Sequence, residues 1–443
     1  MAVKQADRAR FGGEGLRRVR VLVIGSGGRE HALVRGLCAS PNVERVFCTP
    51  GNPGIAALAE NIPADINDHK ALIALAQKNH IDLTVVGPEA PLCAGIVDAF
   101  AAVKLKIFGP SARAARIEGD KSYAKRLMKI AHVPMPEGRS FQRYEDAKAF
   151  VETRENGLVV KAAGLAAGKG VFVCKEPAEA LEALEQVMVR RAFGNAGDTV
   201  VVEELIKGEE LSVFALVCGQ TIYVLETAQD HKAIGDGDTG PNTGGMGAYS
   251  PAPIATPELM ARIERDILVP IVDALRTDDA PYSGLLYAGL MITPGGPKVL
   301  EFNCRFGDPE TQAVLMRLDC DLAELLLATV ENRLDQVEIK WKPQAAVGVV
   351  MASQGYPGEY QAGKVISGLD EVAGMEDVFV FHSGTKPIEH LTVTAGGRVL
   401  TVTALGNDIA AARARAYAAA ERIRFEGAYY RKDIGARAMR AHV

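Results

Sequence analysis

The sequence predicts an α/β and α+β multidomain protein that begins with a parallel, doubly wound sheet. Apolar runs typical of strands alternate with helical stretches over residues 19–112, a pattern typical of parallel strands joined by helices. Farther along, paired apolar runs at 211–228 and 284–302 indicate antiparallel strands in a second, larger unit. At 443 residues, the chain is long enough for roughly two to four domains.

The first predicted domain covers residues 19–120. Its opening segment, "VRVLVIGSGGREHALVRGL" (19–37), reads as a buried strand that breaks at glycine and enters a helix. The apolar runs "VERVFC", "IDLTVVG" and "KIFG" follow, separated by stretches such as "HKALIALAQ" with helical spacing. Residues 1–18 lack an apolar segment and include Asp7 and Glu14, so we expect a disordered extension rather than a targeting peptide.

The rest of the chain reads as two lobes and a final domain. Over 139–205, the strands "GLVVKAA" and "GVFVC" flank a glycine loop, and the long helix "EPAEALEALEQVMVRRAF" and the strand "TVVVEEL" follow, which indicates a small α/β lobe. The antiparallel strands at 211–228 and 284–302 belong to the larger lobe. Further strands and a last helix, "NDIAAARARAYAAAERI", predict a C-terminal domain over 341–443.

The composition favours small-molecule chemistry in a cytoplasmic protein. With 48% hydrophobic and 24% charged residues and a net charge of −5, the chain has the balance of a soluble globular protein and no basic excess for nucleic acid. It contains no run of ~18 consecutive apolar residues, so no membrane span is expected. The seven cysteines are scattered without a CxxC pair, which favours reduced, buried thiols over disulfides or a zinc site.

The turn "GSGGREH" lies between the first strand and its helix. Glycines at such a turn let backbone N–H groups at the helix N-terminus approach an anionic phosphate. A dinucleotide fingerprint would place glycine where this chain has Glu30, so NAD binding is disfavoured. Two interpretations remain open from these residues alone: a site for a single phosphate, or a tight structural turn.

A second glycine-rich loop, "GLAAGKG" (164–170), follows Lys161 in a predicted strand. Glycines let such a loop fold over phosphate oxygens, and a strand lysine supplies the positive charge that a polyphosphate needs. The GxxxxGK[ST] pattern is absent, so the loop is not a Walker A motif. The pattern favours an ATP site, and a hairpin with a solvated lysine is the alternative.

Acidic residues cluster in "VVVEELIKGEEL", with Glu203 and Glu204 at a strand end and Glu209 and Glu210 beyond a glycine. Carboxylates can accept hydrogen bonds from the adenine amino group and from ribose hydroxyls. Solvated acids would produce the same pattern, so both interpretations stay open here.

The segment "KVLEFNCRFGDPETQ" predicts a cation site. In a strand, residues two apart share a face, so Glu301 and Asn303 should point together while Leu300 and Phe302 pack the other way. A carboxylate and an amide oxygen suit Mg²⁺, which takes a few protein oxygens and completes its shell with phosphates and water. Buried acids paired with Arg305 are the alternative.

One long stretch, "QDHKAIGDGDTGPNTGGMGAYSPAP" (229–253), shows almost no helical or strand periodicity. Unstructured connections longer than ~12–15 residues are unusual in compact domains, and those that occur are either disordered or functional. We therefore expect either a substrate-binding loop or a linker.

Taken together, the motifs resemble the ATP-grasp superfamily and, within it, the phosphoribosylamine–glycine ligases, also called glycinamide ribonucleotide synthetases. The resemblance rests on "GSGGREHAL", "VVGPEAPL", "KIFGPSA", "KAAGLAAGKGV", the 229–253 stretch and "EFNCRFGDPETQ". It runs from about Val19 to "RKDIGARA" near the C-terminus. It implies the N-terminal domain, a two-lobed ATP-grasp core over 121–340 whose small lobe (139–205) is mobile, and the C-terminal domain.

The resemblance also implies a reaction. An ATP-dependent ligase would join glycine to 5-phosphoribosylamine, forming glycinamide ribonucleotide, ADP and phosphate in de novo purine biosynthesis. Mg²⁺ or Mn²⁺ would be the cofactor and ATP a co-substrate, with no nucleic-acid or membrane partner and a monomer, or else a dimer, as the active form. Because a carboxylate is a poor electrophile, we expect glycine to react as glycyl phosphate. A carboxylase that activates bicarbonate and a nucleotide-binding regulatory protein without turnover are the competing interpretations.

Carried over position by position, the resemblance implies roles for individual residues. Arg305 and Lys161 would be catalytic, and the metal would be held by Glu301 and Asn303. ATP would contact Lys121, Lys161, Gly168, Lys169, Gly170, Glu203, Glu204, Leu205 and Glu210. Glycine and the ribosylamine would contact Gly27, Gly28, Arg29, Glu30, Gly87, Pro88, Glu89, Asp230, Lys232, Asn242, Thr243, Gly244, Gly245, Met246, Gly247 and Asp308. Ala163 stands where the family often has an acidic or hydroxylic residue, so Lys161 is expected to lack a partner in its own strand.

Overall fold

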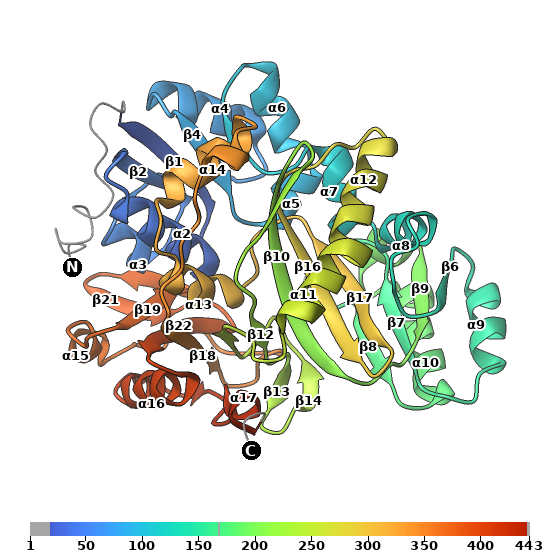
Figure 1. Cartoon of the computed structure of the whole chain (residues 1–443). Coiled ribbons are helices and arrows are strands. Elements are labelled where there is room, and N and C mark those ends of the chain that lie inside the picture. Colours follow the sequence, from blue (N-terminus) through green and yellow to red (C-terminus); the bar gives the residue numbers. More distant parts are fainter. Residues whose placement is uncertain (1–17, 167–168, 441–443) are drawn as a thin grey trace.

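The computed structural model describes residues 18–166 and 169–440. Figure 1 shows the N-terminal sheet in blue, the C-terminal sheet in red below it, a green and yellow sheet at the centre and the teal small lobe on the far side. The predicted extension at 1–18 lies outside the described residues except for Arg18. This arrangement confirms the predicted fold class.

The N-terminal sheet is parallel, with strand order β3-β2-β1-β4-β5. The order reverses beside β1, so the turn that follows β1 lies at the carboxyl edge where ligands bind in doubly wound sheets. The bounds are β1 Val19–Gly25, α2 Gly28–Ala39, β2 Val43–Pro50, α3 Pro53–Ala56, β3 Glu60–Asn61, α4 His69–Lys78, β4 Leu83–Val86, α5 Glu89–Cys93, α6 Ile96–Ala102, β5 Ile107–Phe108, α7 Ala112–Gly119 and α8 Lys121–Ile130.

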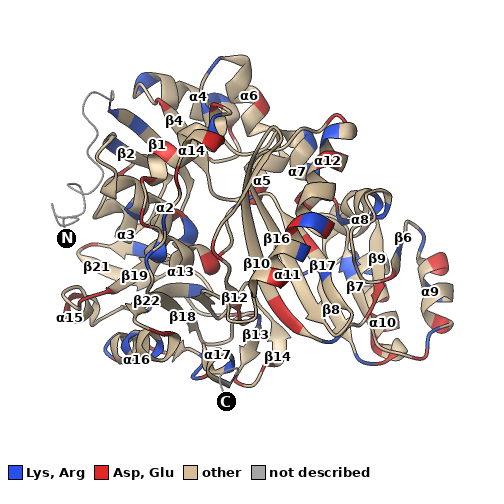
Figure 2. Ribbon diagram, viewed as in Figure 1, with Lys and Arg blue, Asp and Glu red and all other residues tan. Residues whose placement is uncertain are grey.

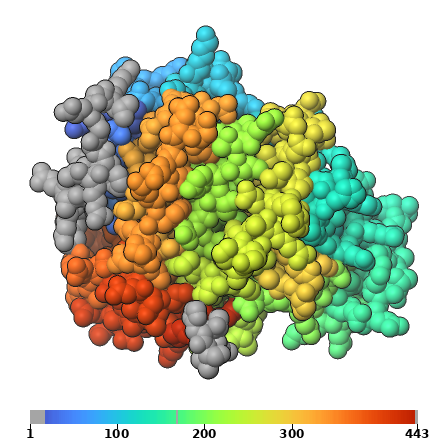
Figure 3. Space-filling model, viewed as in Figure 1, coloured from blue at the N-terminus to red at the C-terminus, as the bar shows by residue number. Residues whose placement is uncertain are grey.

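The small lobe has an antiparallel sheet of order β6-β9-β7-β8 and a hydrophobic core of its own. In the space-filling view it forms one edge of the molecule (Figure 3). The predicted long helix is shorter than expected, because the chain leaves helical geometry and reaches positive φ at Arg191. The bounds are β6 Gly138–Phe141, α9 Tyr144–Glu152, β7 Leu158–Ala162, β8 Val171–Cys174, α10 Pro177–Leu184, a π-helical turn Glu185–Val189, a 3₁₀ turn Gly194–Gly197 and β9 Val200–Glu204.

The larger lobe is built on the antiparallel sheet β11-β10-β16-β17. The register between β16 and β17 shifts, so that Leu290 pairs with Val299 and Gly289 with Glu301, and Leu300 is left as the extra residue of a bulge. The bounds are β10 Glu209–Cys218, β11 Thr221–Val224, α11 Pro257–Ile263, a π-helical turn Glu264–Leu268, α12 Val269–Thr277, β16 Ser283–Thr293, β17 Gly296–Asn303, α13 Glu310–Arg317, α14 Leu322–Val330 and a 3₁₀ turn Leu334–Gln336.

The C-terminal sheet has the order β12-β15-β18-β22-β19, with β23 paired to β18. Its first two strands come from the 229–253 stretch, which also forms the β13–β14 hairpin. The stretch is therefore part of the folded domain and not an unstructured linker. These strands are only two to four residues long, too short to produce a visible period. The bounds are β12 Gln229–Asp230, β13 Ala233–Gly235, β14 Thr239–Asn242, β15 Gly247–Ser250, β18 Ala345–Ser353, α15 Leu369–Val372, β19 Val378–His382, β20 Thr385–Ile388, β21 Leu391–Thr394, β22 Arg398–Gly406, α16 Ile409–Ala420, β23 Ala428–Tyr429 and α17 Ala436–Arg440.

The surface charges and the cysteines agree with the composition. Figure 2 shows Lys and Arg interspersed with Asp and Glu over the same elements. All seven cysteines are free thiols, although Cys38, Cys93 and Cys320 are only half-buried. In the part of the chain that the structure describes, every helix is too short or too polar to cross a membrane.

The N- and C-terminal sheets meet through two buried histidines. The His382 backbone N–H donates to Nδ1 of His31 at 2.9 Å. Asn52 joins the same contact by donating to the carbonyl oxygens of Ser26 and His382, both at 2.8 Å. Burial lowers the pKa of His31 well below its usual value and that of His382 to about 4. Both rings are therefore neutral in the folded protein near pH 7.

Acid should weaken this junction before the carboxylates titrate. Between pH 6.5 and 5 the unfolded chain binds protons at these histidines while the folded chain does not, so stability falls as pH falls, by up to ~1.4 kcal/mol per pH unit for each histidine. We expect His382→Gln to reduce the slope of unfolding free energy against pH in this window, measured by urea unfolding. The exposed His390 provides the control: His390→Gln should keep the wild-type slope, and an unchanged slope in His382→Gln would contradict the assignment.

Candidate active site

Two adjoining cavities of about 130 and 410 Å³ lie between the small lobe and the larger lobe. Both are lined by Lys161, Val171, Glu203, Leu300, Glu301, Asn303 and Arg305. The smaller cavity adds the predicted residues Glu89, Lys121 and Gly170. The larger cavity adds the predicted residues Glu204, Leu205, Glu210, Asp230, Lys232, Asn242, Thr243, Gly244 and Asp308. The structure thus brings together most of the residues that the sequence motifs single out.

Lys161, on β7, has a partner from the neighbouring strand. Its Nζ lies 2.7 Å from Glu203 Oε2 and donates to the Leu300 carbonyl at 3.0 Å. Glu203 lies on β9, diagonally across from Lys161 in the antiparallel register, a separation that long side chains can span. The expected lack of a partner within the lysine's own strand therefore does not leave Lys161 unpaired.

Lys125 takes the other oxygen of Glu203, at 2.5 Å, and also donates to the Pro136 carbonyl at 2.7 Å. Both carboxylate oxygens of Glu203 are thereby used to hold lysines in place. The sequence motifs do not single out Lys125, although it lies one helical turn after Lys121 on α8, a spacing that puts both on one face.

Glu301 and Asn303 end β17 and open into both cavities, as the alternation predicts. Within the described residues, neither side chain has a hydrogen-bond partner in the protein. Burial would raise the pKa of Glu301, but the charges of Lys232, Lys161 and Lys121 lower it, so the carboxylate is ionised. An ionised carboxylate beside an amide oxygen is a donor pair that fits a divalent cation.

The expectation that Leu300 packs away from the site is wrong. The bulge in β17 leaves Leu300 lining both cavities. Phe302 is 2% exposed, but it lines the smaller cavity, so the prediction that it packs away from the site is wrong as well. No cluster of three or more His, Cys, Asp or Glu suited to a metal exists among the residues that the structure describes. A cation at Glu301 and Asn303 would therefore need oxygens from a substrate as well.

Arg305 is fixed between two carboxylates. Its guanidinium lies 3.2 Å from Glu89 and 3.1 Å from Glu118, and Glu118 also accepts the Cys304 backbone N–H at 2.7 Å. Burial would lower the pKa of Arg305, but the two carboxylates raise it above its usual value. Glu118, on α7, is a site residue that the sequence motifs miss.

Lys232 lines the larger cavity together with Lys161 and Arg305. Its Nζ lies 3.2 Å from Asp230 and 3.3 Å from Glu210. Burial would lower the pKa of Lys232, but Asp230 and the other acidic groups around it raise the pKa well above its usual value. Glu310, another residue that the motifs miss, accepts a hydrogen bond from Ser212 at 3.2 Å, and burial raises its pKa.

The Glu30 carboxylate holds the "GSGGRE" turn in place through hydrogen bonds. The Gly27 N–H donates to one carboxylate oxygen at 2.5 Å, and Arg29 Nε donates to the other at 2.6 Å. Glu30 itself is only 2% exposed. A side chain at Gly87 would overlap Glu30, which explains the glycine there. Predicted contacts that do not line either cavity are Gly27, Gly28, Arg29, Glu30, Gly87 and Pro88.

The segment Thr243–Gly247 meets the larger cavity only at its beginning. Thr243 and Gly244 line that cavity, while Gly245 packs against Pro309. Met246 is fully buried against Val350 and Ala352, so its side chain does not reach the cavity. The remaining predicted contacts divide as follows: Gly247 and Lys169 line neither cavity, and Gly168 lies outside the described residues.

Comparison with known proteins connects this geometry to a family. Models described as phosphoribosylglycinamide synthetase N domain, ATP-grasp (A) domain and C domain match residues 19–118, 119–311 and 346–437. The chain belongs to the phosphoribosylglycinamide synthetase family. The middle match contains Lys121, Lys125, Lys161 and Lys232, and the strands β9 and β17 that carry Glu203, Glu301 and Asn303. The candidate site therefore falls mainly in the ATP-grasp domain of this family.

Relatives and a solved structure agree with the phosphoribosylglycinamide synthetase assignment. The chain is 49% identical over 426 residues to a phosphoribosylamine–glycine ligase of Rhodopirellula baltica, covering 95% of this chain and 98% of that one. It is 50% identical to one of Vibrio vulnificus, covering 95% and 99%. The crystal structure of the Thermotoga maritima phosphoribosylamine–glycine ligase superposes with a TM-score of 0.80 at 32% identity, covering 94% and 100%.

The likeness extends more weakly to another enzyme class. A biotin carboxylase domain of the Hydrogenobacter thermophilus 2-oxoglutarate carboxylase superposes with a TM-score of 0.71, covering 94% of this chain and 92% of that one, at 14% identity. Identity this low shows a shared fold alone. It does not support the competing interpretation as a carboxylase, since the chain belongs to the phosphoribosylglycinamide synthetase family.

Proposed function

We propose that the two cavities form the active site in which this chain ligates glycine to 5-phosphoribosylamine. The reaction consumes ATP and yields glycinamide ribonucleotide, ADP and phosphate for purine biosynthesis. The observation that supports this site best is the position of Glu301 and Asn303, which open into the space between Lys161 and Lys232.

The smaller cavity would receive the ATP phosphates. Lys121 and Lys161 would neutralise them, and the glycine loop at 164–170 would cover them. The adenosine would lie at the strand end and beyond it, against Glu203, Glu204, Leu205 and Glu210. A divalent cation held by Glu301 and Asn303 would offset the charge that builds on the transferring phosphoryl group.

The larger cavity would hold the adenosine where Glu204, Leu205 and Glu210 line it, and glycine and the amine where Asp230, Lys232 and Asp308 line it. One glycine carboxylate oxygen attacks the γ-phosphorus, ADP leaves, and the product is glycyl phosphate. The nitrogen of phosphoribosylamine then attacks the carbonyl carbon, phosphate leaves with that oxygen, and the nitrogen loses a proton. Arg305, held by Glu89 and Glu118, would stabilise the oxyanion formed at the carbonyl.

The remaining predicted residues would bind the ribosylamine and exclude water. The "GSGGRE" turn at the N-terminus of α2 would receive the 5′-phosphate, and Gly87, Pro88 and Glu89 would contact the ribose. Closure of the small lobe over the site would protect glycyl phosphate from hydrolysis. The Asp230–Gly247 segment would contact glycine and the amine.

Oxygen labelling tests the glycyl phosphate step. Glycine labelled with ¹⁸O in its carboxylate should be turned over with ATP, Mg²⁺ and phosphoribosylamine generated in place. We expect one heavy oxygen in each phosphate released, measured by mass spectrometry, because glycine's oxygen becomes the bridge to phosphorus. Phosphate with only solvent oxygen as its new atom would rule out this intermediate. ADP release that persists when bicarbonate replaces glycine would instead support the carboxylase interpretation.

A further inference from the structure

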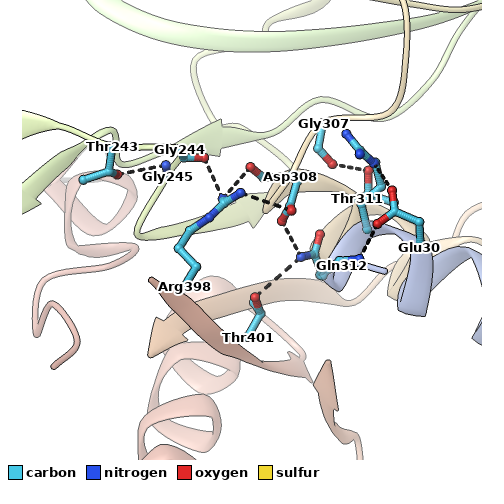
Figure 4. Close-up of polar contacts among 12 residues, drawn as sticks. Glu30, Thr243, Gly244, Gly245, Gly307, Asp308, Thr311, Gln312, Arg398 and Thr401 are labelled. Atoms are coloured by element: carbon cyan, nitrogen blue, oxygen red, sulfur yellow. Dashed lines mark hydrogen bonds and ion pairs between the residues drawn. The ribbon is translucent and has the colours of Figure 1, made fainter. Parts of the chain in front are cut away.

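Arg398 connects the C-terminal sheet to the candidate site. It begins β22, yet its guanidinium reaches two segments of the ATP-grasp region (Figure 4). One terminal nitrogen donates to the carbonyl oxygens of Gly244 and Asp308, both at 2.7 Å. The other donates to the Asp308 carboxylate at 3.1 Å. A single side chain therefore holds the segment Thr243–Gly245 against Asp308.

Asp308 is fixed from its other side as well. Gln312, on α13, donates to Asp308 Oδ1 at 2.8 Å. The second oxygen, Oδ2, faces the "GSGGRE" turn of the N-terminal domain, since a Cβ built on Gly27 would lie 3.6 Å from it. Burial would raise the pKa of Asp308, but Arg398 and Arg29 lower it, so an ionised acceptor is held beside the turn.

The Thr243–Gly245 segment is anchored by the same C-terminal domain at a second point. The Gly244 N–H donates to the Tyr356 hydroxyl at 3.0 Å, and the Gly245 N–H donates to Thr243 Oγ1 at 2.9 Å. The Gly244 N–H and the Gly244 carbonyl are therefore both bonded to side chains of the C-terminal domain, those of Tyr356 and Arg398. The position of this wall of the larger cavity depends on the C-terminal domain.

The contacts of Arg398 lie on one side of the site only. Asp308 and Gly244 line the larger cavity and not the smaller one, where the ATP phosphates would bind. Arg398 contacts these two residues and not Glu204, Leu205 or Glu210, which would contact the adenosine. We propose that Arg398 is a positioning residue for phosphoribosylamine, which orients the Asp308 carboxylate toward the ribose and fixes the wall at Gly244. This inference rests on the proposed function of the two cavities. It makes the C-terminal domain part of amine recognition without a role in binding ATP.

The shape of the guanidinium is important for this role. Its planar fork presents several N–H donors in fixed directions, whereas a lysine ammonium is a compact point charge on a flexible stem. Arg398→Lys should keep the charge near Asp308 but lose part of the three-way contact. We therefore expect the affinity of Arg398→Lys for glycinamide ribonucleotide to lie between that of the wild type and that of Arg398→Ala.

The test measures two ligands on the full-length chain. Calorimetry would give the Kd of glycinamide ribonucleotide, the stable product, and of ATP with Mg²⁺. Arg398→Ala should raise the Kd of glycinamide ribonucleotide at least about tenfold, which is the effect of losing hydrogen bonds to a charged group. The Kd of ATP should change less than about threefold. In turnover, KM for phosphoribosylamine should rise more than kcat falls.

Arg415→Ala is the matched control. Arg415 is also an arginine of the C-terminal domain with an ion pair, to Asp377 at 3.1 Å, and a hydrogen bond to a carbonyl, that of Leu405. Both partners lie within the C-terminal domain, and among the described residues neither lines either cavity. Arg415→Ala should bind both ligands as the wild type does. Wild-type binding of glycinamide ribonucleotide by Arg398→Ala would overturn the inference, and so would equal weakening of both ligands. Failure of the unsubstituted chain to bind glycinamide ribonucleotide would instead overturn the proposed function, and the inference with it.

Discussion

Glu301→Gln should lower kcat by at least about 100-fold while the protein stays folded. The substitution keeps the size of the side chain but removes the negative charge that, with Asn303, would hold the cation. Each tenfold loss corresponds to ~1.4 kcal/mol of transition-state stabilisation, so a 100-fold loss needs only ~2.7 kcal/mol. That is a modest value for a metal that neutralises a transferring phosphoryl group. Glu301 also has no hydrogen-bond partner in the described residues, so folding should not depend on its charge.

The measurement is glycine-dependent ADP release at saturating Mg²⁺, together with the thermal midpoint. Glu324→Gln is the matched control. Glu324 is a half-buried carboxylate on α14 that forms an ion pair with Arg333 at 2.5 Å and lines neither cavity. The control should retain turnover. Near-normal turnover in Glu301→Gln would show that the cation is held by other residues.

Gly245→Val should lower kcat/KM by at least about tenfold. Gly245 has φ +109° and a Cβ there would overlap the Pro309 ring, with Asp230 3.6 Å away. Valine adds a branched side chain in a backbone conformation that such residues avoid, at a cost of roughly 1–3 kcal/mol. The Thr243–Gly245 segment must therefore move away from Pro309, which displaces the cavity wall at Gly244.

Gly363→Val separates this displacement from backbone strain alone. Gly363 has φ +88°, but a Cβ there meets no atom within 4 Å. Both variants should lose thermal stability, and only Gly245→Val should lose activity. Equal kinetics in the two variants would mean that the segment does not line the substrate site.

Several features of the site follow from local sequence. Glu301 and Asn303 open into the same cavities because side chains alternate along a strand. The alternation fails at Leu300, which lines both cavities, and at Phe302, which lines the smaller one. The bulge at Leu300 arises from the register between β16 and β17 rather than from β17 itself. The partner of Lys161 is likewise absent from its own strand and is supplied by Glu203 across the sheet.

The sequence by itself determined the family and the order of the sheets, and it predicted the residues that we propose for phosphate and metal binding. It could do so because these depend on local patterns: apolar periods, glycine turns and short motifs whose neighbours in sequence are neighbours in space. The tertiary structure alone decided that Lys125 shares Glu203, that Glu118 holds Arg305 and that Arg398 reaches Asp308. The two residues of each pair are far apart along the sequence: Lys125 and Glu203, Glu118 and Arg305, and Asp308 and Arg398. Their distance in space is set by strand register and domain packing. No local pattern encodes that distance, because it emerges only when the sheets pack together.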